Sequence, residues 1–269
     1  MDLLVVTAVK NDLRGLLETR KSILDQSIDP HWVIVTPFDF SETHRACLEF
    51  LKLGQVNRLI QDDGHGVYSA MNKAIFESEG TDWIWFLNAG DEFAARNSYE
   101  IVKSTVAKIE SRWLYGGHFL GSESRKILGE FKSPRAFKTS NQLFARKYIS
   151  HQATIFQVGF LQELNGFDLQ YKIAADWDLM CRASKVELPV RVDIPLCIFY
   201  MGGLSTKSRQ ESNKELLQIR SIYLPRKYLL KSYYWFFYRF LRNFFVQSIE
   251  DKFPELANSI RKVRIRAKR

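Results

Sequence analysis

The sequence predicts an α/β protein whose mostly parallel sheet is flanked by helices and followed by a C-terminal amphipathic helical extension. Three observations favour this class. Apolar, β-branched runs alternate with segments of helical spacing, glycine or proline ends many of these segments, and the excess positive charge lies at the C-terminal end. Strands that alternate with helices in this way are typical of parallel sheets with helices on both faces.

The first half of the chain supplies the clearest elements. LLVVTAV at 3–9 is a continuous apolar run of the kind found in strands buried on both faces. Apolar residues recur at near-helical spacing over 13–25, and WVIVT at 32–36 is a second strand. Ser41 is a suitable N-cap for a helix over 41–53. The alternation continues with a strand at 57–61, a helix at 67–78 and a strand at 83–87.

Beyond residue 95 the pattern loosens. A helix is expected at 97–111, and the segments WLYGGHFLG and RKILGEF resemble strands. A long polar stretch then leads to SHQATIF at 150–156. The remaining expectations, in chain order, are helices near 158–165 and 176–187, strands near 189–193 and 196–201, a turn at 202–206 and a helix at 208–222.

Composition places the body of the protein in a reducing compartment. Hydrophobic residues make up 46% and aromatic residues 14%, which is enough for a large core. The three cysteines are far apart, so we expect them to be free and buried rather than metal ligands. There is no signal-peptide pattern and no uncharged run of the roughly 18–20 residues that a membrane span needs. We therefore expect a cytoplasmic protein.

The charge divides the chain in two. Residues 226–269 hold 12 Lys and Arg against 3 Asp and Glu, whereas 1–225 hold 27 of each. We therefore predict one domain at 1–225 and a basic, aromatic helical tail at 226–269. KYLLKSYYWFFYRFLRNFFV at 227–246 contains ten aromatic residues, and on a helix its bases share one face. This pattern is typical of a helix lying in an anionic membrane surface, with packing on the domain or on a second subunit as the alternative. Bases and aromatics are not interleaved, which disfavours nucleic acid.

Acidic and small residues follow the predicted strand at 83–87. The stretch DWIWFLNAGDEF runs from five large apolar residues into Asn88, Ala89 and Gly90, and then into Asp91 and Glu92. Ligands of open parallel sheets lie outside the carboxyl ends of the strands, so these acids should face a crevice. A carboxylate there can hold Mg²⁺ together with substrate phosphates, although a surface turn or helix N-cap is the alternative.

Other strand ends carry polar residues as well. TAVKND ends the first strand, and QDDGHGVYSAMNKAI places acids and two glycines before a helix with Tyr68, Asn72 and Lys73. Later, Asp176 and Asp178 open a predicted helix after two alanines. A carboxylate at that place can serve as a general base if it reaches a substrate hydroxyl, and N-terminal capping is the alternative.

These segments together resemble family-two inverting glycosyltransferases of the GT-A fold, in the branch that builds bacterial surface polysaccharides. The resemblance rests on VVTAVKND, GVYSAMNKAI, WIWFLNAGDEF, HQATIF, GFDLQYKIAADWDL and GGLS, which span about residues 3–206. It implies a nucleotide-diphospho-sugar donor, a divalent metal (Mn or Mg), and transfer to a saccharide acceptor, which we expect to be lipid-linked.

The resemblance also implies roles for individual residues. Asp91 matches the metal position, with Asn88 and Gly90 where acids are frequent, and Asp176 matches the catalytic base, with Asp178 as the second choice. His151 and Gln152 match the HQ pair on the acceptor or donor-sugar side, to which Trp177 and Asp178 also belong, although a lone His is often a structural residue. The nucleotide-sugar site would comprise Thr7, Ala8, Val9, Asn11, Asp39, Tyr68, Asn72, Lys73, Asn88, Ala89 and Gly90.

Two other functions remain open on the sequence alone. A sugar-phosphate nucleotidyltransferase would share the architecture, but such enzymes open with a glycine-rich loop, and TAVKNDLRG has one late glycine. A scaffold protein without catalysis would keep the fold and dispense with the acids. The sugar, the nucleotide and the acceptor are not specified by the sequence.

Overall fold

A computed structural model describes residues 1–225 of the chain apart from 40, 79, 146–148 and 202–208. The chain divides into two compact units, Met1–Ile219 and Arg220–Arg269. The tail expected at 226–269 and the GGLS segment lie outside the described residues. The boundary that the charge predicts therefore stays a prediction. No helix of the described part is long and apolar enough to cross a membrane.

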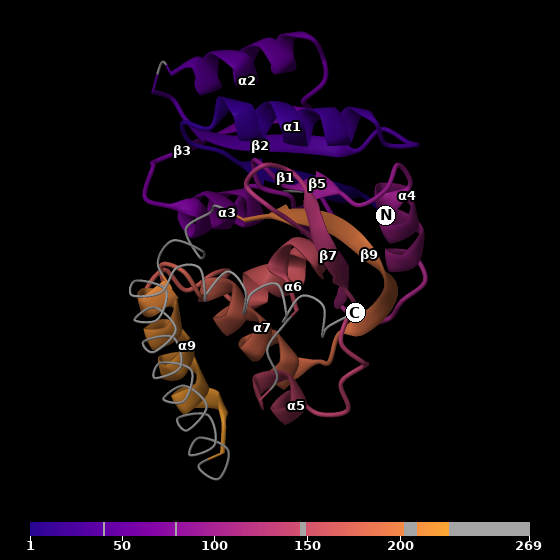
Figure 1. Cartoon of the computed structure of the whole chain (residues 1–269), viewed down its shortest axis with the longest axis vertical. Helices are drawn as coiled ribbons and strands as arrows, with labels where there is room; N and C mark the ends of the chain where they lie inside the picture. Colours follow the sequence, from indigo (N-terminus) through magenta and orange to yellow (C-terminus); the bar gives the residue numbers. More distant parts are fainter. Residues whose placement is uncertain (40, 79, 146–148, 202–208, 226–269) are drawn as a thin grey trace, which may run out of the picture. The chain divides into compact units, whose positions relative to one another are not determined.

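The first half forms the parallel sheet that the alternation predicts (Figure 1). Strands β3, β2, β1 and β4 lie side by side in that order, and each pair is parallel. Ser41 caps α2 as expected, because its hydroxyl accepts a 3.1 Å hydrogen bond from the backbone N–H of His44. The elements of this half are β1 Leu3–Ala8, α1 Leu13–Leu24, β2 His31–Pro37, α2 Glu42–Lys52, β3 Arg58–Asp62, α3 Val67–Phe76 and β4 Trp83–Phe86.

The second half extends the sheet with mixed strand directions. Strand β8 joins the edge of β4 antiparallel, β6 follows it, and β9 then runs parallel to β6. The elements, in chain order, are β5 Glu92–Phe93, α4 Ser98–Val106, β6 Trp113–Gly121, β7 Ile127–Phe131, α5 Ser140–Ala145, the 3-10 turn η1 His151–Ala153, β8 Thr154–Gln157, α6 Val158–Glu163, α7 Ala175–Val186, β9 Val190–Tyr200 and α9 Arg209–Tyr223.

Three features of this half differ from the expectation. The two strands expected near 189–193 and 196–201 are one strand, β9, whose register against β6 shifts beside Pro195. Proline lacks the N–H that a regular ladder needs, so the break in the sequence pattern marks an irregularity rather than a strand end. The short elements β5 and α5 were not predicted, and the helix expected to reach residue 111 ends at Val106.

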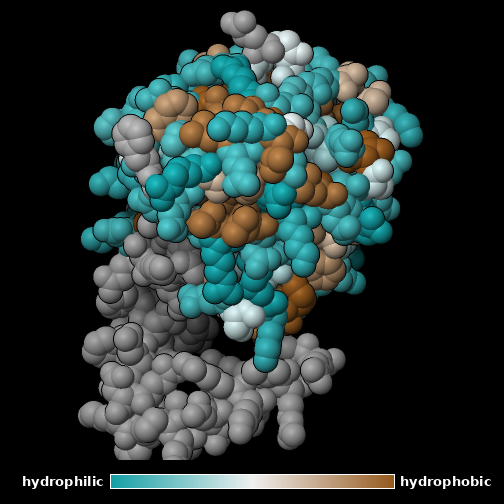
Figure 2. Space-filling view, turned by 90° about the horizontal axis from the view of Figure 1, so that it is seen from above, coloured by the Kyte–Doolittle hydropathy of each residue, from teal (hydrophilic) through white to brown (hydrophobic). Residues whose placement is uncertain are grey.

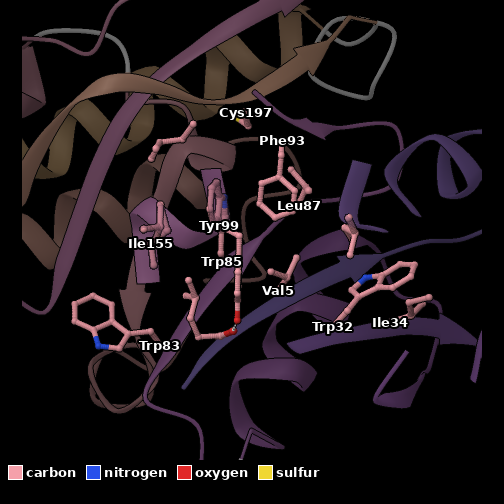
Figure 3. Packing of buried hydrophobic residues seen from close by; sticks show 14 of the residues in the cluster. Val5, Trp32, Ile34, Trp83, Trp85, Leu87, Phe93, Tyr99, Ile155 and Cys197 are labelled. Atoms are coloured by element: carbon pink, nitrogen blue, oxygen red, sulfur yellow. Dashed lines mark hydrogen bonds between the residues drawn. The ribbon is translucent and has the colours of Figure 1, made fainter. Parts of the chain in front are cut away.

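The core lies between the sheet and the helices that cover it. Figure 3 shows Trp85, Leu87, Phe93 and Tyr99 together with Val5 from the neighbouring strand. Trp85 and Phe93 pack edge to face with ring centroids 4.9 Å apart. The three cysteines are buried and free, as the composition predicts.

Helices α1 and α2 keep part of their apolar surface exposed to solvent. Viewed from above in Figure 2, apolar surface shows between hydrophilic residues. Helices α1 and α2 contribute exposed leucines, of which Leu17, Leu24, Leu48 and Leu51 are 37–48% exposed. Single exposed leucines of this kind are normal on a soluble surface.

Candidate active site

Asp176 occupies the first turn of α7 and is half-buried. Its Oδ1 accepts hydrogen bonds from the backbone N–H of Trp177, at 2.8 Å, and from the hydroxyl of Tyr68, at 3.2 Å. Burial raises the pKa of Asp176 above its usual value, and the neighbouring His151 and the two hydrogen bonds oppose that rise. The result is a carboxylate that is held in place and is more basic than a surface aspartate.

Tyr68 connects α3 to the segment that enters α7. Its hydroxyl lies 2.8 Å from the backbone carbonyl of Ile173 and 3.2 Å from Asp176. A phenol carries one proton, so this proton is shared between two acceptors or moves from one to the other. Burial and the charge of Asp176 raise the pKa of Tyr68 well above 10, so the hydroxyl stays protonated near neutral pH.

His151 and Gln152 are consecutive residues at the start of η1, and each faces a different acid. His151 lies close enough to Asp176 for the two charges to interact. Burial lowers the pKa of His151, and the Asp176 carboxylate opposes that effect. Because the net direction is downward from 6.5, the imidazole is mainly neutral at pH 7.

Gln152 faces Asp91. The carbonyl of Gln152 accepts a 2.7 Å bond from the indole of Trp85, which fixes the residue against the core of β4. The side chain of Gln152 and the backbone N–H of Tyr200 bond to the carboxyl of Asp91 and lower its pKa, but burial dominates and raises that pKa to about 7. Asp91 is only 5% exposed, so it is a deeply placed carboxyl beside the end of β4.

The turn between β4 and Asp91 is held by β1 and α1. The backbone N–H of Gly90 donates to the carbonyl of Gly15 at 3.0 Å and to the hydroxyl of Thr19, also at 3.0 Å. Gly90 has φ of +96°, a conformation that favours glycine, and a Cβ there would meet no atom within 4 Å. The small residues after β4 therefore serve the turn itself and also leave open space beside it.

Asn88 and Ala89 join this turn to the end of β1. Oδ1 of Asn88 and the backbone N–H of Ala89 bond to the backbone of Ala8, both at 3.4 Å. Glu92, which the sequence placed with Asp91 at the crevice, opens β5 and forms an ion pair with Arg125. The guanidinium of Arg125 also lies over the ring of Tyr200, 3.8 Å from its centroid. Glu92 is thus neutralised by a partner that the sequence did not indicate.

Residues expected at the nucleoside are divided between core and surface. Thr7, Ala8 and Val9 are buried, and the hydroxyl of Thr7 bonds to the Leu87 carbonyl at 2.8 Å. Asn11 is exposed with φ of +51°. Asp39 is exposed too, and its bonds to Ser41 lower its pKa. The structure does not bring Asp39 into contact with Asp91 or Asp176, and these assignments to the donor stay predictions.

Two further donor-site candidates lie on α3. Both polar groups of the Asn72 side-chain amide bond to the backbone of Phe167. The amide Nδ2 donates to the Phe167 carbonyl at 2.8 Å, and the amide Oδ1 accepts from the Phe167 N–H at 2.7 Å. Asn72 therefore anchors the chain that leads to α7, a task the sequence did not assign to it. Lys73 is 3.8 Å from Asp63 in an ion pair and keeps 33% of its side chain exposed.

The neighbours of Asp176 on α7 have different surroundings. Asp178 is 3% exposed and its Oδ2 accepts a 2.8 Å bond from Arg182, one turn along the helix. Arg182 also bonds to the carbonyls of Leu164 and Gly166. The carboxyl of Asp178 is therefore tied into a structural network. The indole N–H of Trp177 is buried and bonds to none of the described residues.

The site offers a metal ion few acidic ligands. Within the described part of the chain, no three His, Cys, Asp or Glu side chains are grouped as a metal site. Asp91, with the amide of Asn88 nearby in the same turn, supplies one carboxylate and one carbonyl oxygen. Mg²⁺ is often bound by one or two carboxylates together with substrate phosphates. Burial raises the pKa of the Asp91 carboxyl to about 7 even though the positive charge of Arg125 opposes that rise. The donor set therefore fits a metal that is shared with a phosphorylated ligand.

Comparison with known proteins gives a consistent result. Residues 4–107 match the family described as Glycosyl transferase family 2. An uncharacterised glycosyltransferase of Mycobacterium tuberculosis is 29% identical over 204 residues, which cover 75% of this chain and 76% of that protein. A PGL/p-HBAD biosynthesis glycosyltransferase of Mycobacterium bovis is 31% identical over 157 residues, covering 57% and 58% of the two chains.

Solved structures share the fold at low sequence identity. The structure of S. aureus TarS 1-349 in complex with UDP superimposes with a TM-score of 0.61 at 13% identity, covering 82% of this chain and 65% of that one. The mannosyltransferase PcManGT from Pyrobaculum calidifontis, in complex with GDP-Man and Mn²⁺, gives 0.59 at 16% identity, covering 81% and 62%. These likenesses establish a GT-A-like architecture for the described domain.

Proposed function

We propose that the chain is an inverting glycosyltransferase of family 2, because residues 4–107 match that family and the fold is GT-A-like. It would move a sugar from a nucleotide-diphospho-sugar to a hydroxyl of a saccharide acceptor. Its relatives include a PGL/p-HBAD biosynthesis glycosyltransferase of Mycobacterium bovis. We propose an acceptor that is lipid-linked and a role in the synthesis of a cell-surface polysaccharide or glycolipid.

The observation that carries this proposal is the setting of Asp176. Two donors orient its carboxylate, burial raises its pKa, and the neutral ring of His151 lies beside it. A general base works best when its pKa approaches the working pH and its geometry is fixed. Asp178, the other acid in this turn, is engaged by Arg182 and is less suited to take a proton.

The donor is the part of the proposal that the structural neighbours support. Structures with similar folds hold UDP, UDP-GlcNAc or GDP-Man. In this chain the open space at Gly90 and the turn Asn88–Asp91 stand at the carboxyl end of β4, where ligands of such sheets bind. We propose that the diphosphate lies there, with Asn11, Lys73 and the ends of β1 and β2 toward the nucleoside.

For the divalent metal we propose Asp91 as the protein ligand, with Asn88 as the second candidate. When bound, such an ion would neutralise the charge that develops on the leaving diphosphate. Gln152 would orient the Asp91 carboxylate through its amide, and Trp85 in turn fixes Gln152.

The transfer then needs one proton acceptor and no covalent intermediate. The acceptor oxygen bonds to the anomeric carbon as the bond from that carbon to the diphosphate breaks on the opposite face, which inverts the configuration. The hydroxyl proton passes to Asp176. While Asp176 is ionised, the proton of Tyr68 stabilises it; once Asp176 is protonated, the same phenol proton can stay with the carbonyl of Ile173. Positioned proton transfer typically contributes about 10²–10⁴-fold.

We assign the tail, 226–269, to attachment at the cytoplasmic face of the cell membrane. The sequence of the tail supports this assignment: on a helix its bases would lie on one face and its aromatic residues on the other, and RKVRIRAKR follows at the end. Deleting 226–269 should release the protein from anionic liposomes. If the shortened chain still binds them, the tail packs on the domain or on a second subunit instead.

The proposal is tested by a panel of nucleotide-sugars, each offered with and without Mn²⁺ or Mg²⁺. We expect one of them to bind, and to be slowly hydrolysed by water when no acceptor is present. The matched variants are Asp176→Asn, which should keep donor binding and lose turnover, and Asp29→Asn, an exposed acid that serves as the control. A protein that binds none of the donors with metal present is not the enzyme proposed here.

A further inference from the structure

Glu215 on α9 holds the backbone that leads into the proposed base. Its carboxylate accepts hydrogen bonds from three consecutive residues: Lys172 at 2.9 Å, Ile173 at 2.9 Å and Ala174 at 2.8 Å. Consecutive N–H groups that converge in this way form a nest for an anion, and bonds to a charged acceptor are stronger than neutral ones. Glu215 and the segment it holds belong to the same compact unit, Met1–Ile219.

The held segment is in direct contact with the groups around Asp176. The N–H of Ile173 points to Glu215, while its carbonyl accepts the bond from Tyr68. Ala174 is the N-cap residue of α7, and its carbonyl accepts the hydrogen bond from the backbone N–H of Asp178. Glu215 and Tyr68 thus bond to the two backbone groups of the same residue, Ile173, which lies three residues before Asp176.

The N-cap residue of α7 makes no side-chain hydrogen bond that could fix the start of the helix. This residue is Ala174, which has no side chain that could bond to the free N–H groups of the first turn. The helix position, and with it the position of the Asp176 carboxylate, therefore depends on ties from elsewhere. Glu215 supplies three of them, directly before the helix.

We propose that Glu215 is a positioning residue for the base: it fixes residues 172–174 so that Tyr68 and Asp176 keep the geometry needed to take the acceptor proton. This inference rests on the proposed function, in which Asp176 is the base. Both carboxylate oxygens of Glu215 accept hydrogen bonds from backbone N–H groups. Glu215 therefore holds the segment in place rather than contacting substrate. Its charge also helps to raise the pKa of Tyr68, which keeps that phenol a donor.

The test compares three variants of the full chain. Glu215→Gln keeps the size but replaces one acceptor oxygen by an amide NH₂, which cannot accept a bond from a backbone N–H. Glu215→Asp keeps the charge on a shorter side chain. Glu211→Gln makes the same chemical change one helical turn earlier on α9, at an exposed residue, and is the matched control.

Two measurements are made on each variant. Amide hydrogen exchange measures how firmly Glu215 holds the backbone of residues 172–174, and it does not depend on activity. We expect these amides to exchange at least about tenfold faster in Glu215→Gln, while exchange in β1 and β4 is unchanged. In sugar transfer we expect kcat to fall by about tenfold to a hundredfold with the donor KM changed less than about twofold, because a small misplacement of a catalytic group is costly. Glu215→Asp should recover part of kcat, and Glu211→Gln should match the wild type.

The pH profile separates positioning from plain stabilisation. If Tyr68 loses its hold on Asp176, the ionised carboxylate loses a donor, and the acidic limb of kcat/KM should move to higher pH in Glu215→Gln. Unchanged exchange at 172–174, or faster exchange with kcat and the pH profile intact, would overturn the inference. If Glu215→Gln does not fold, Glu215→Asp is judged by the same criteria. If the wild-type protein transfers no sugar, the proposed function is wrong. The exchange data then still show whether Glu215 bonds to the backbone of residues 172–174.

Discussion

The hydroxyl of Tyr68 on α3 lies 3.2 Å from Oδ1 of Asp176 on α7, which joins two helices that are 108 residues apart in the chain. The bond links the parallel half of the sheet to the helix that carries the proposed base. In the proposed mechanism the phenol would also take part in proton transfer, since the second acceptor of that hydroxyl is the Ile173 carbonyl at 2.8 Å. Removing one oxygen atom tests this link.

Tyr68→Phe should raise the pKa of Asp176. The bond favours the ionised carboxylate, and a bond to a charged group contributes about 1.5–3 kcal/mol, or roughly 1–2 pKa units. Because the base works when ionised, the acidic limb of the kcat/KM profile should move to higher pH by that amount. The measurement is a pH series of initial rates at low donor concentration. A limb that stays in place, or moves to lower pH, means that Tyr68 does not stabilise the base.

Gly166→Ala should destabilise the domain and loosen the chain before α7. Gly166 has φ of +62°, and a Cβ there would lie 2.3 Å from Oδ1 of Asn72, which holds the Phe167 backbone. A left-handed alanine alone costs about 1–3 kcal/mol. Chemical denaturation measures the change, with Gly129→Ala as control because a Cβ there meets nothing within 4 Å. Equal stability of the two variants would contradict both the cost of the left-handed backbone and the clash with Asn72.

Asp178→Asn separates structure from catalysis on α7. The carboxylate of Asp178 is buried and accepts the Arg182 bond at 2.8 Å, so its loss should lower the free energy of unfolding by about 1–3 kcal/mol. The pH profile of transfer should keep its acidic limb, because the base is elsewhere. Thermal melting and rate profiles of one preparation check both points. A variant that melts normally and has lost transfer would make Asp178 the base.

The sequence predicted the parallel half of the fold through local patterns. Runs such as LLVVTAV and WVIVT are long and apolar enough to define β1 and β2, and Ser41 marks the start of α2 by a rule of local chemistry. Strand β5 is two residues long and has no period to detect. Pro195 made one strand look like two, because a proline inside an interior strand is rare.

What the sequence could not supply were the partners of charged residues. Glu92 was grouped with Asp91 because both follow β4, yet its partner Arg125 lies in the β6–β7 turn. Glu215 sits within a polar helix and has no local signal, since its three bonds reach more than forty residues back. Asn72 was assigned to the donor from its place in a motif, whereas both of its polar groups bond to Phe167. Such pairings depend on tertiary contacts.

Removing divalent metal tests whether Asp91, in the turn after β4, is a metal ligand. With one carboxylate from Asp91, we expect weak metal binding that depends on the donor diphosphate. Chelation by EDTA should abolish transfer, and added Mn²⁺ or Mg²⁺ should restore it. Asp91→Asn should then require a higher metal concentration for half-maximal rate, measured by titrating the ion at fixed donor. Full activity in EDTA would rule out the metal, and an unchanged requirement in Asp91→Asn would assign it to other ligands.

The central claim is that Asp176 takes the proton of the acceptor hydroxyl. The most direct measurement pairs donor binding by calorimetry with the rate of sugar transfer in wild type and Asp176→Asn, at saturating donor and acceptor. We predict that the donor dissociation constant changes less than about threefold, while kcat falls by about 10²–10⁴-fold. An Asp176→Asn enzyme that turns over within tenfold of the wild type would contradict the account.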